Sequence, residues 1–347
     1  MGAVGAPAPT DAHARVADPD WVEHRFPAMG SHTHLVLLGT RADADWAEHE
    51  IHRLERHWSR FTTTSDVARA NRAAGLAPVA VASETLDLVA AAAEWWHRTD
   101  GWFDPTVLHA LETLGYDAPF TEVRDRPTGA PVVRSAPPGR PELRIPAVGR
   151  PPAAQSAPGC AGIVIDRTAG TVHLPAGVGI DLGGIGKGAA ADLVAAGLRA
   201  RGVTAACVSM GGDVRAFGAG NGPDGRGWAI PVEDPADEAR VLFTTVVDDA
   251  AIVTCTDRFR RWVAAGREHH HLVDPTTGLP AETGLTAVVV ADATCARAEV
   301  LAKAAFVAGP TRGAALLARF GVTAWFVDDR GTCTPTDASA DPAVVSR

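Results

Sequence analysis

Apolar and polar residues alternate with two different periods along the chain, which predicts both strands and helices. Short apolar runs bounded by glycine or polar residues indicate strands, whereas apolar residues at helical spacing, as at Trp46, Ile51, Leu54 and Trp58, indicate helices. The predicted strands are residues 32–39, 177–184, 204–212, 286–293 and 323–329, with a hairpin over residues 162–175. The predicted helices are residues 42–61, 83–101, 187–203 and 296–309. Because these elements are mixed without strict βαβ repetition, we predict an α+β fold rather than a doubly wound parallel sheet.

Three segments lack this periodicity. Residues 1–20 are rich in Ala, Pro and Asp and are predicted to be a disordered tail, and residues 333–347 are predicted to be a loose C-terminal tail. Residues 117–160 are rich in proline, which predicts an exposed insertion without a packed element. The folded domain is therefore expected to span residues 21–332, interrupted by this insertion.

Composition and charge narrow the function classes. The 347 residues are 46% hydrophobic, as in a globular protein, and carry a formal net charge of −9. No cluster of Lys and Arg provides the basic face that a nucleic-acid-binding protein needs, so we expect no nucleic-acid partner. The five cysteines lie far apart, which predicts free thiols in a reducing compartment. Since the sequence contains no leader-like segment and no run of ~20 apolar residues, we predict a soluble cytoplasmic protein without membrane insertion.

The strongest local signal is the glycine-rich segment DLGGIGKGAAAD, residues 181–192. Glycines at the start of a helix leave amide groups open to an anion such as a phosphate. The segment is not a Walker A loop, because Gly188 stands where that motif requires Ser or Thr. It matches a dinucleotide fingerprint only weakly, as Gly184-x-Gly186-x-x-Ala189. A tight turn with small residues for packing is the alternative, and the segment alone does not decide between them.

A run of three histidines, residues 269–271, leads directly into the sequence LVDPTTGLP. Asp274, Pro275 and Gly278 specify a turn that would hold His271 rigidly. We therefore expect His271 to be the functional histidine of the three.

Taken in order, these segments resemble the ApbE family, the FAD:protein FMN transferases. The resemblance covers roughly residues 27–330 outside the insertion, and its order and spacing are more specific than any single glycine motif. The matching segments are AMGSHTHLVL, LERHWSRFTTTSDVARANRAAG, GWFDPTV, GIDLGGIGKGAAAD, SMGGDVRAFG, TCTDRFRRW and HHLVDPTTGLP, together with the helix ARAEVLAKAAFVAG. The resemblance implies a two-lobed, T-fold-like α+β domain with the active site in the cleft between lobes.

The resemblance also implies a reaction and a set of site residues. FAD, bound with magnesium, would be attacked by a threonine of an acceptor flavoprotein, which would receive FMN while AMP leaves. The implied FAD-binding residues are Met29, Phe61, Phe103, Asp104, Asp181, Gly183, Lys187 and His271. His271 and Asp274 would lie near the reacting phosphates as catalytic residues, and Gly184 would offer a backbone metal ligand.

One departure from the family pattern concerns the metal. The family commonly has Asp and Thr as magnesium ligands in its last helix, where this chain has Glu299 and Lys303. A protonated lysine cannot ligate a cation, so a normal magnesium site is in doubt. The two residues are four apart with Glu first, which favours an ion pair between them. A flavin-binding protein with lost or altered chemistry, either FAD-hydrolysing or metal-independent, is therefore the first alternative function, and an NAD(P) oxidoreductase is the second.

Overall fold

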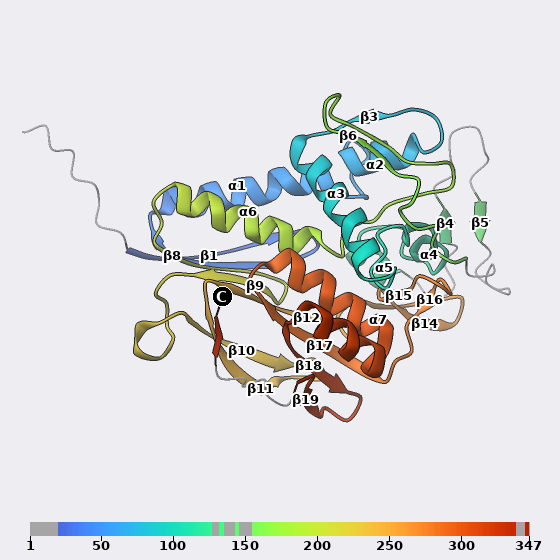
Figure 1. Cartoon of the computed structure of the whole chain (residues 1–347). Coiled ribbons are helices and arrows are strands. Elements are labelled where there is room, and N and C mark those ends of the chain that lie inside the picture. The colour runs from blue at the N-terminus through green and yellow to red at the C-terminus, as the bar shows by residue number, and fades with distance from the viewer. Residues whose placement is uncertain (1–19, 127–131, 135–142, 146–154, 338–343, 347) are drawn as a thin grey trace, which may run out of the picture.

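The computed structural model describes residues 20–126, 132–134, 143–145, 155–337 and 344–346. Its centre is an eight-stranded sheet in the order β1-β2-β8-β9-β12-β17-β18-β19, in which every neighbouring pair is antiparallel (Figure 1). The strands are β1 (Asp20–Ala28), β2 (Ser31–Gly39), β8 (Ala205–Met210), β9 (Asp213–Phe217), β12 (Ala250–Thr256), β17 (Leu285–Asp292), β18 (Thr323–Asp328) and β19 (Cys333–Pro335). The predicted α+β class is confirmed.

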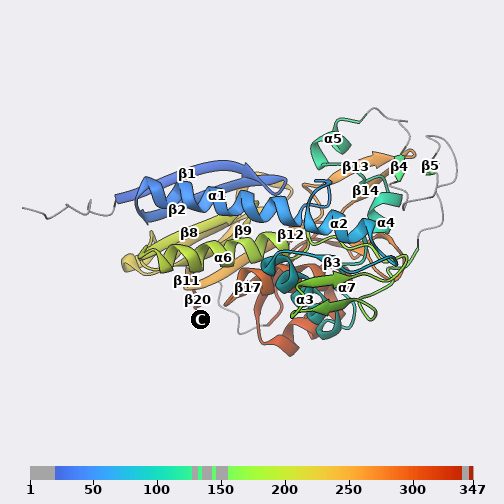
Figure 2. The ribbon, with the colours of Figure 1, turned by 90° about the horizontal axis from the view of Figure 1, so that it is seen from above.

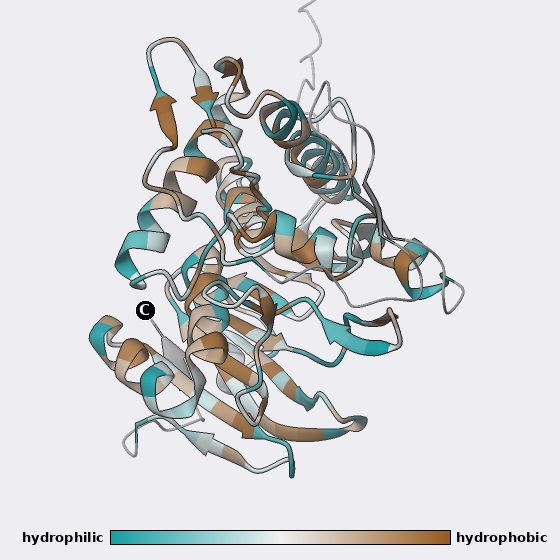
Figure 3. Ribbon diagram, turned by 90° about the vertical axis from the view of Figure 1, so that its right-hand side faces the viewer, coloured by the Kyte–Doolittle hydropathy of each residue, from teal (hydrophilic) through white to brown (hydrophobic). Residues whose placement is uncertain are grey.

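Three long helices cover one face of this sheet: α1 (Arg41–Trp58), α6 (Gly186–Ala200) and α7 (Cys295–Phe320). Helices α1 and α6 lie side by side (Figure 2). Thr40 begins α1 with a capping box in which its side chain and that of Asp43 satisfy each other's backbone amides. Of the apolar stripe predicted for this helix, Ile51, Leu54 and Trp58 are buried and Trp46 is partly buried against the core. The hydropathy colouring shows brown and teal segments alternating along the helices (Figure 3).

The opposite face of the sheet is covered by a smaller sheet of β10 (Trp228–Asp234), β11 (Asp237–Asp248) and β20 (Val344–Ser346). Trp228 on β10 packs in a buried cluster with Ile252 and Trp325 of the large sheet. The η1 turn (Pro223–Gly225) precedes β10. The molecule is thus layered as helices, large sheet and small sheet.

The remaining elements gather at one end of the layers, on the right in Figure 1. The helices there are α2 (Asp66–Arg72), α3 (Ser83–Arg98), α4 (Leu108–Thr113) and α5 (Phe120–Arg124). The short strands are β3 (Val79–Ala80), β4 (Val132–Arg134), β5 (Leu143–Ile145), β6 (Val164–Asp166), β7 (Thr171–His173), β13 (Arg261–Ala264), β14 (Arg267–His270), β15 (Val273–Asp274) and β16 (Leu279–Pro280). A second apolar cluster, which includes Leu111, Tyr116 and Trp262, holds α4 and α5 against β13.

The strand predicted for residues 177–184 is absent from the structure of that described segment. The chain there pairs with no neighbouring strand, and its backbone bonds instead to the side chain of Asn71 and to the carbonyl of Pro105. The Asn71 amide donates to the carbonyl of Ile180 at 2.9 Å and accepts from its N–H at 2.8 Å. The Asn71 side chain thus satisfies both backbone groups of Ile180, while the N–H of Asp181 donates to the carbonyl of Pro105 at 2.8 Å.

Two segments predicted to be unstructured are partly ordered. Within the insertion, α5 packs Val123 into the cluster around Tyr116, because Pro119 begins a short helix whose apolar side faces the domain. In the C-terminal tail, β19 hydrogen-bonds to β18 and forms the edge of the large sheet, and β20 pairs with β11. The predicted disorder of residues 1–19, and most of the insertion from residue 127 to residue 154, lie outside the described residues.

Helix α7 is longer than the predicted helix 296–309, because the chain turns at Gly309 (φ 76°) and Pro310 and then resumes a helix to Phe320. Of the helices in the described ranges, α7 alone is long and apolar enough to cross a membrane by length and composition. It serves here as a core helix, since Leu301 and Phe306 have no exposed surface.

Candidate functional site

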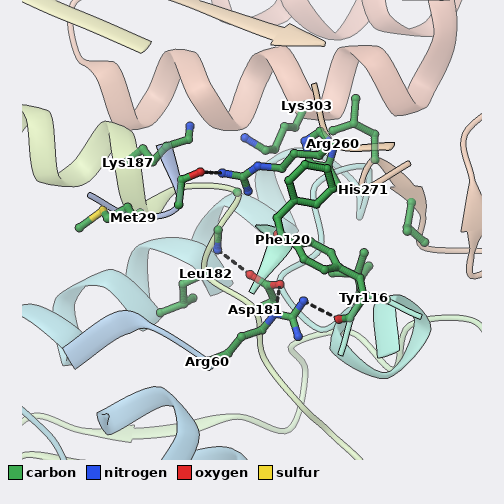
Figure 4. Close-up of a pocket in the computed structure, with 18 of the residues that line it drawn as sticks. Met29, Arg60, Tyr116, Phe120, Asp181, Leu182, Lys187, Arg260, His271 and Lys303 are labelled. Carbon is green, nitrogen blue, oxygen red and sulfur yellow. Dashed lines mark hydrogen bonds and ion pairs between the residues drawn. The ribbon is translucent and has the colours of Figure 1, made fainter. Parts of the chain in front are cut away.

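A cavity of about 450 Å³ opens where the end of α1, the start of α6 and the middle of α7 converge (Figure 4). It brings together all of the site residues predicted from the sequence except Asp274 and Glu299. Segments far apart in the chain supply its walls. The predicted residues that line it are Met29, Phe61, Phe103, Asp104, Asp181, Gly183, Gly184, Lys187, His271 and Lys303.

Met29 reaches the cavity from the tight turn between β1 and β2. Its backbone is left-handed (φ 50°), as is that of Gly30 (φ 67°), and its N–H donates to Oε1 of Glu55 at 2.8 Å. A left-handed conformation is uncommon for a residue with a side chain, so the turn is held by this bond from α1. The sequence AMGS therefore encodes a fixed position for the methionine side chain.

An ion pair between Arg60 and Asp181 joins the end of α1 to the glycine-rich loop. Nε of Arg60 lies 2.8 Å from Oδ2 of Asp181, and its terminal nitrogen donates to the carbonyl of Tyr116 at 2.7 Å. The guanidinium lies 4.1 Å from the ring centre of Phe61 and 4.7 Å from that of Tyr116. Asp181 also accepts from the N–H of Gly183 at 2.7 Å. The rings of Phe61 and Tyr116 thus form an aromatic wall around the Arg60 guanidinium, whose charge the carboxylate of Asp181 balances.

Phe103 and Asp104 lie at the corner between α3 and α4. Phe103 is 4% exposed and belongs to the main core while one edge lines the cavity. Asp104 accepts from the N–H and the hydroxyl of Thr106 at 2.7 and 2.6 Å, and burial raises the pKa of its carboxyl. The corner is thus both a packing element and part of the site.

On the other side of the loop, four charged side chains form what we call the lysine–carboxylate cluster: Lys187, Asp213, Glu299 and Lys303. Oε1 of Glu299 accepts from Nζ of Lys187 at 2.8 Å and from Nζ of Lys303 at 2.9 Å, while its Oε2 accepts from the N–H of Gly188 at 2.8 Å. Lys187 also pairs with Asp213. The predicted Glu299–Lys303 pair is confirmed.

The carboxylate of Glu299 has no exposed surface. Burial on its own raises the pKa of this carboxyl, but the charges of Lys187 and Lys303 and the hydrogen bonds outweigh it and lower the pKa to about 2. Glu299 is therefore ionised and buried, which is tolerated only because every one of its bonds comes from a donor in the protein.

The amides of the glycine-rich loop are largely occupied within the protein. The N–H groups of Ile185 and Gly186 donate to the carbonyl of Leu182, that of Gly183 to Asp181, and that of Gly188 to Glu299. The expectation of a row of bare glycine amides for phosphate is therefore wrong for Gly183, Gly186 and Gly188. Small residues are needed here for close approach, since a Cβ on Gly188 would lie 2.6 Å from the backbone of Cys295.

His271 lines the cavity beside these cations. Its Nδ1 is buried and finds no hydrogen-bond partner among the described residues. Burial, and then the nearby charges of Arg260 and Lys303, hold the pKa of the imidazole well below its usual range, so the ring is neutral at pH 7. Asp274 does not reach the cavity: it accepts from the N–H and hydroxyl of Thr276 at 2.8 and 2.7 Å and so shapes the turn that follows His271.

Comparison with known proteins connects this cavity to a family. A model of the ApbE family matches residues 29–326. The chain belongs to the ApbE family. A protein named FAD:protein FMN transferase from Vibrio cholerae is 28% identical over 280 residues, which cover 79% of this chain and 77% of that protein. Another of that name, from Treponema pallidum, is 35% identical over 167 residues, or 45% of this chain and 46% of that protein.

Solved ApbE structures share the fold. The crystal structure of the Thermotoga maritima ApbE protein superposes with a TM-score of 0.74 at 28% identity, covering 91% of this chain and 97% of that one. The apo form of the Pseudomonas stutzeri flavinyl transferase ApbE superposes with a TM-score of 0.71 at 26% identity, covering 91% and 95%. A dinucleotide-binding fold for an NAD(P) oxidoreductase is excluded, because that motif needs parallel strands and the large sheet is antiparallel throughout.

The ApbE resemblance implies magnesium at Gly184, Glu299 and Lys303, and these residues do not fit it. Both oxygens of Glu299 already accept hydrogen bonds, and Lys303 has no lone pair to offer while protonated. Within the described ranges, no three His, Cys, Asp or Glu side chains are grouped so that they could hold a metal ion.

Sequence reasoning missed several residues of this ApbE site. Arg60 and Arg260 are the cations that it overlooked, and Tyr116 and Phe120 are the missing aromatic rings. Both arginines lie inside segments that carried the resemblance, at SRF and DRFRRW, so an Arg beside an aromatic residue was the available signal.

Proposed function

We propose that this protein cleaves FAD, transfers the FMN part to an acceptor protein and releases AMP. The observation that carries the proposal is the pairing of an aromatic wall and a cationic wall in one cavity of about 450 Å³. Such a cavity suits a ligand that joins flat rings through a diphosphate. The proposal is supported by membership of the ApbE family and by relatives named FAD:protein FMN transferase.

In this proposal the flavin lies against Met29, Phe61 and Phe103. The Arg60–Asp181 pair and the bond from Gly183 keep the glycine-rich loop beside it, while the turn of Asp104 fixes the facing corner. Lys187 lines the same cavity and, through its pairs with Asp213 and Glu299, also orients the lysine–carboxylate cluster.

The chemical step is a phosphoryl-group displacement. A hydroxyl oxygen of the acceptor, which we propose to be a threonine, attacks the phosphorus on the FMN side of the diphosphate. A new P–O ester bond forms, the bond to the AMP phosphate breaks, and AMP leaves with the electron pair. The hydroxyl proton goes to the neutral imidazole of His271, whose lowered pKa keeps it unprotonated before the step. Asp274 is a positioning residue that holds the turn after His271.

The cellular setting is part of the same proposal. All five cysteines are free in the structure, and the four with the most burial, Cys160, Cys207, Cys255 and Cys295, have thiol pKa values raised by burial. Thiols of this kind suit the reducing cytoplasm, where we place the enzyme.

The test is to incubate the purified protein with FAD and an FMN-binding acceptor domain that carries an exposed threonine. We expect stoichiometric AMP release and an acceptor whose mass increases by one FMN. The same acceptor with that threonine replaced by alanine is the control. AMP release that is equally fast without acceptor would indicate FAD hydrolysis, and FAD that binds but is never cleaved would indicate a flavin-binding protein without transferase chemistry.

A further inference from the structure

The lysine–carboxylate cluster is electrically complete without a metal ion. It contains two carboxylates, Asp213 and Glu299, and two ammonium groups, Lys187 and Lys303. These are the only two lysines among the 347 residues, whereas the other positive charges are all arginines. Lysine, whose ammonium group is a compact point charge, thus occurs in this protein only within the lysine–carboxylate cluster.

A divalent cation would have to enter this cluster by breaking it. Magnesium requires oxygen ligands at about 2.0–2.1 Å in near-octahedral geometry. The position next to Oε1 of Glu299 is taken by Nζ of Lys303 at 2.9 Å and by Nζ of Lys187 at 2.8 Å, and Oε2 is bound by the amide of Gly188. A divalent cation that entered this position would break these hydrogen bonds of Glu299, and two ammonium charges would repel it.

Lys303 keeps donors that the protein does not use. An ammonium has three N–H bonds, and the described residues provide Lys303 with one acceptor, Glu299. Its side chain is 16% exposed and lines the cavity, where Gly184 is close enough that a Cβ there would lie 3.3 Å from Cδ of the lysine. The free donors are therefore available at the loop expected to receive the diphosphate.

Arg260 supplies a second cation on the same wall. Its guanidinium lines the cavity and makes a long bond of 3.4 Å to the carbonyl of Gly30. In the part of the chain that the structure describes, no carboxylate pairs with it. Lys303, Arg260 and His271 all line the same cavity, so the two cations face one space (Figure 4).

We propose that Lys303, oriented by Glu299 and assisted by Arg260, holds the diphosphate of the ligand and replaces the divalent cation at this site. This inference rests on the proposed function for the identity of the ligand. During the displacement the ammonium stays beside the oxygen that leaves with AMP and compensates its growing negative charge. No metal ion and no further reactant enter the step, and the bonds formed and broken are those given above.

The two lysines provide a direct probe. Protein labelled with ¹³C at the lysine side chains should give two side-chain signals in an NMR spectrum, and Lys303→Arg assigns them by removing one. With EDTA present, we expect inorganic pyrophosphate and FAD each to shift the Lys303 signal. Magnesium added alone should move neither signal.

Binding and turnover complete the test. We expect the affinity for FAD, followed by flavin fluorescence, to differ by less than about twofold between EDTA and magnesium, with AMP release in both. Lys303→Met should weaken FAD and pyrophosphate binding about 10- to 100-fold, as for the loss of one charge-assisted hydrogen bond, and Lys303→Arg should lose less.

The failures of this inference and of the proposed function are distinguishable. If FAD binds and is cleaved only with magnesium, and Lys303→Met binds it as well as the wild type, the lysine does not replace the metal although the transferase proposal stands. If pyrophosphate shifts Lys303 without metal but FAD neither binds nor reacts, the cation assignment stands and the proposed function is wrong.

Discussion

The two ends of the glycine-rich loop handle charge in opposite ways. At Asp181 one carboxylate pairs with one cation, and Arg60 also donates to the carbonyl of Tyr116 and lies against two aromatic rings. At Gly188 the carboxylate of Glu299 meets two cations, and one of them, Lys303, keeps free donors toward the cavity.

This difference separates the two tasks of the site. A cation that pairs with one carboxylate and lies against two aromatic rings adds rigidity but has little attraction for an anion, whereas an oriented ammonium with free donors attracts one. We therefore expect the Asp181 end to shape the ring-binding wall and the Gly188 end to bind phosphate. The following predictions test this division, beginning with the largest effect.

Glu299→Ala should remove the centre of the lysine–carboxylate cluster and destabilise the protein by about 3–5 kcal/mol. The substitution leaves Lys187 buried with one partner fewer and the amide of Gly188 without its acceptor, and an uncompensated buried charge is costly. Urea unfolding measures the loss. Glu299→Gln is the control, with a smaller expected loss because one side-chain oxygen still accepts. An alanine variant as stable as the wild type would mean that the lysines reach solvent and that the cluster is not held together by Glu299.

Two glycines in the loop should respond differently to the same substitution. In Gly188→Ala the new Cβ would meet the backbone of Cys295 at 2.6 Å, which forces α6 away from α7 and should cost about 1–3 kcal/mol of stability. In Gly184→Ala it would meet side-chain atoms rather than backbone, of Phe103 at 2.9 Å and of Lys303 at 3.3 Å, so a smaller adjustment relieves the contact.

Gly184→Ala should therefore keep most of its stability while its affinity for FAD falls roughly tenfold, about 1.4 kcal/mol of binding energy. Thermal unfolding and flavin fluorescence titration of both variants separate the two effects. Equal losses of affinity in the two variants, with equal stability, would contradict the assignment of Gly188 to packing.

At the Asp181 end, a double-mutant cycle of Arg60→Met and Asp181→Asn should give a coupling energy within about 0.5–3 kcal/mol in unfolding experiments. Because the double variant removes one charge of each sign, its affinity for pyrophosphate should stay close to that of the wild type. A loss of pyrophosphate affinity as large as that of Lys303→Met would show that both ends of the loop bind phosphate.

Local sequence patterns correctly predicted those features that depend on residues close together in the chain. The helix carrying Glu299 and Lys303, and the pairing of those two residues, follow from a spacing of four along one helix. The turn after His271 follows from Asp274 and Gly278, whose φ is 69°.

Such patterns could not predict contacts between segments that are distant in the sequence. Lys187 meets Glu299 across 112 residues, and Asn71 meets Ile180 across 109 residues, so no periodicity indicates either contact. The apolar segment before the loop therefore suggested a strand, and the side chain that replaces the strand partner was invisible. The same limit concealed the occupied amide of Gly188, since its acceptor is Glu299 on another helix.

The smallest expected effect is a pH dependence of stability that originates at His271. An unperturbed histidine has a pKa of about 6.5, and in the folded protein burial and the charges of Arg260 and Lys303 depress the pKa of His271. As the pH falls below 6.5, the unfolded chain therefore binds a proton that the native protein does not, and stability decreases; above pH 7 both states are neutral and the group has no effect. Between pH 7.5 and 5.5 the titration of His271 changes the free energy of unfolding by at most about 1.4 kcal/mol, because a single proton is involved.

His269 and His270, whose pKa values burial also lowers, contribute a similar pH dependence of stability, which remains in every variant at position 271. Urea unfolding at the two pH values should thus show that His271→Gln loses less stability on acidification than the wild type. Equal losses in the two proteins would mean that His271 titrates normally, and the neutral imidazole assigned to the proton transfer would then have to be abandoned.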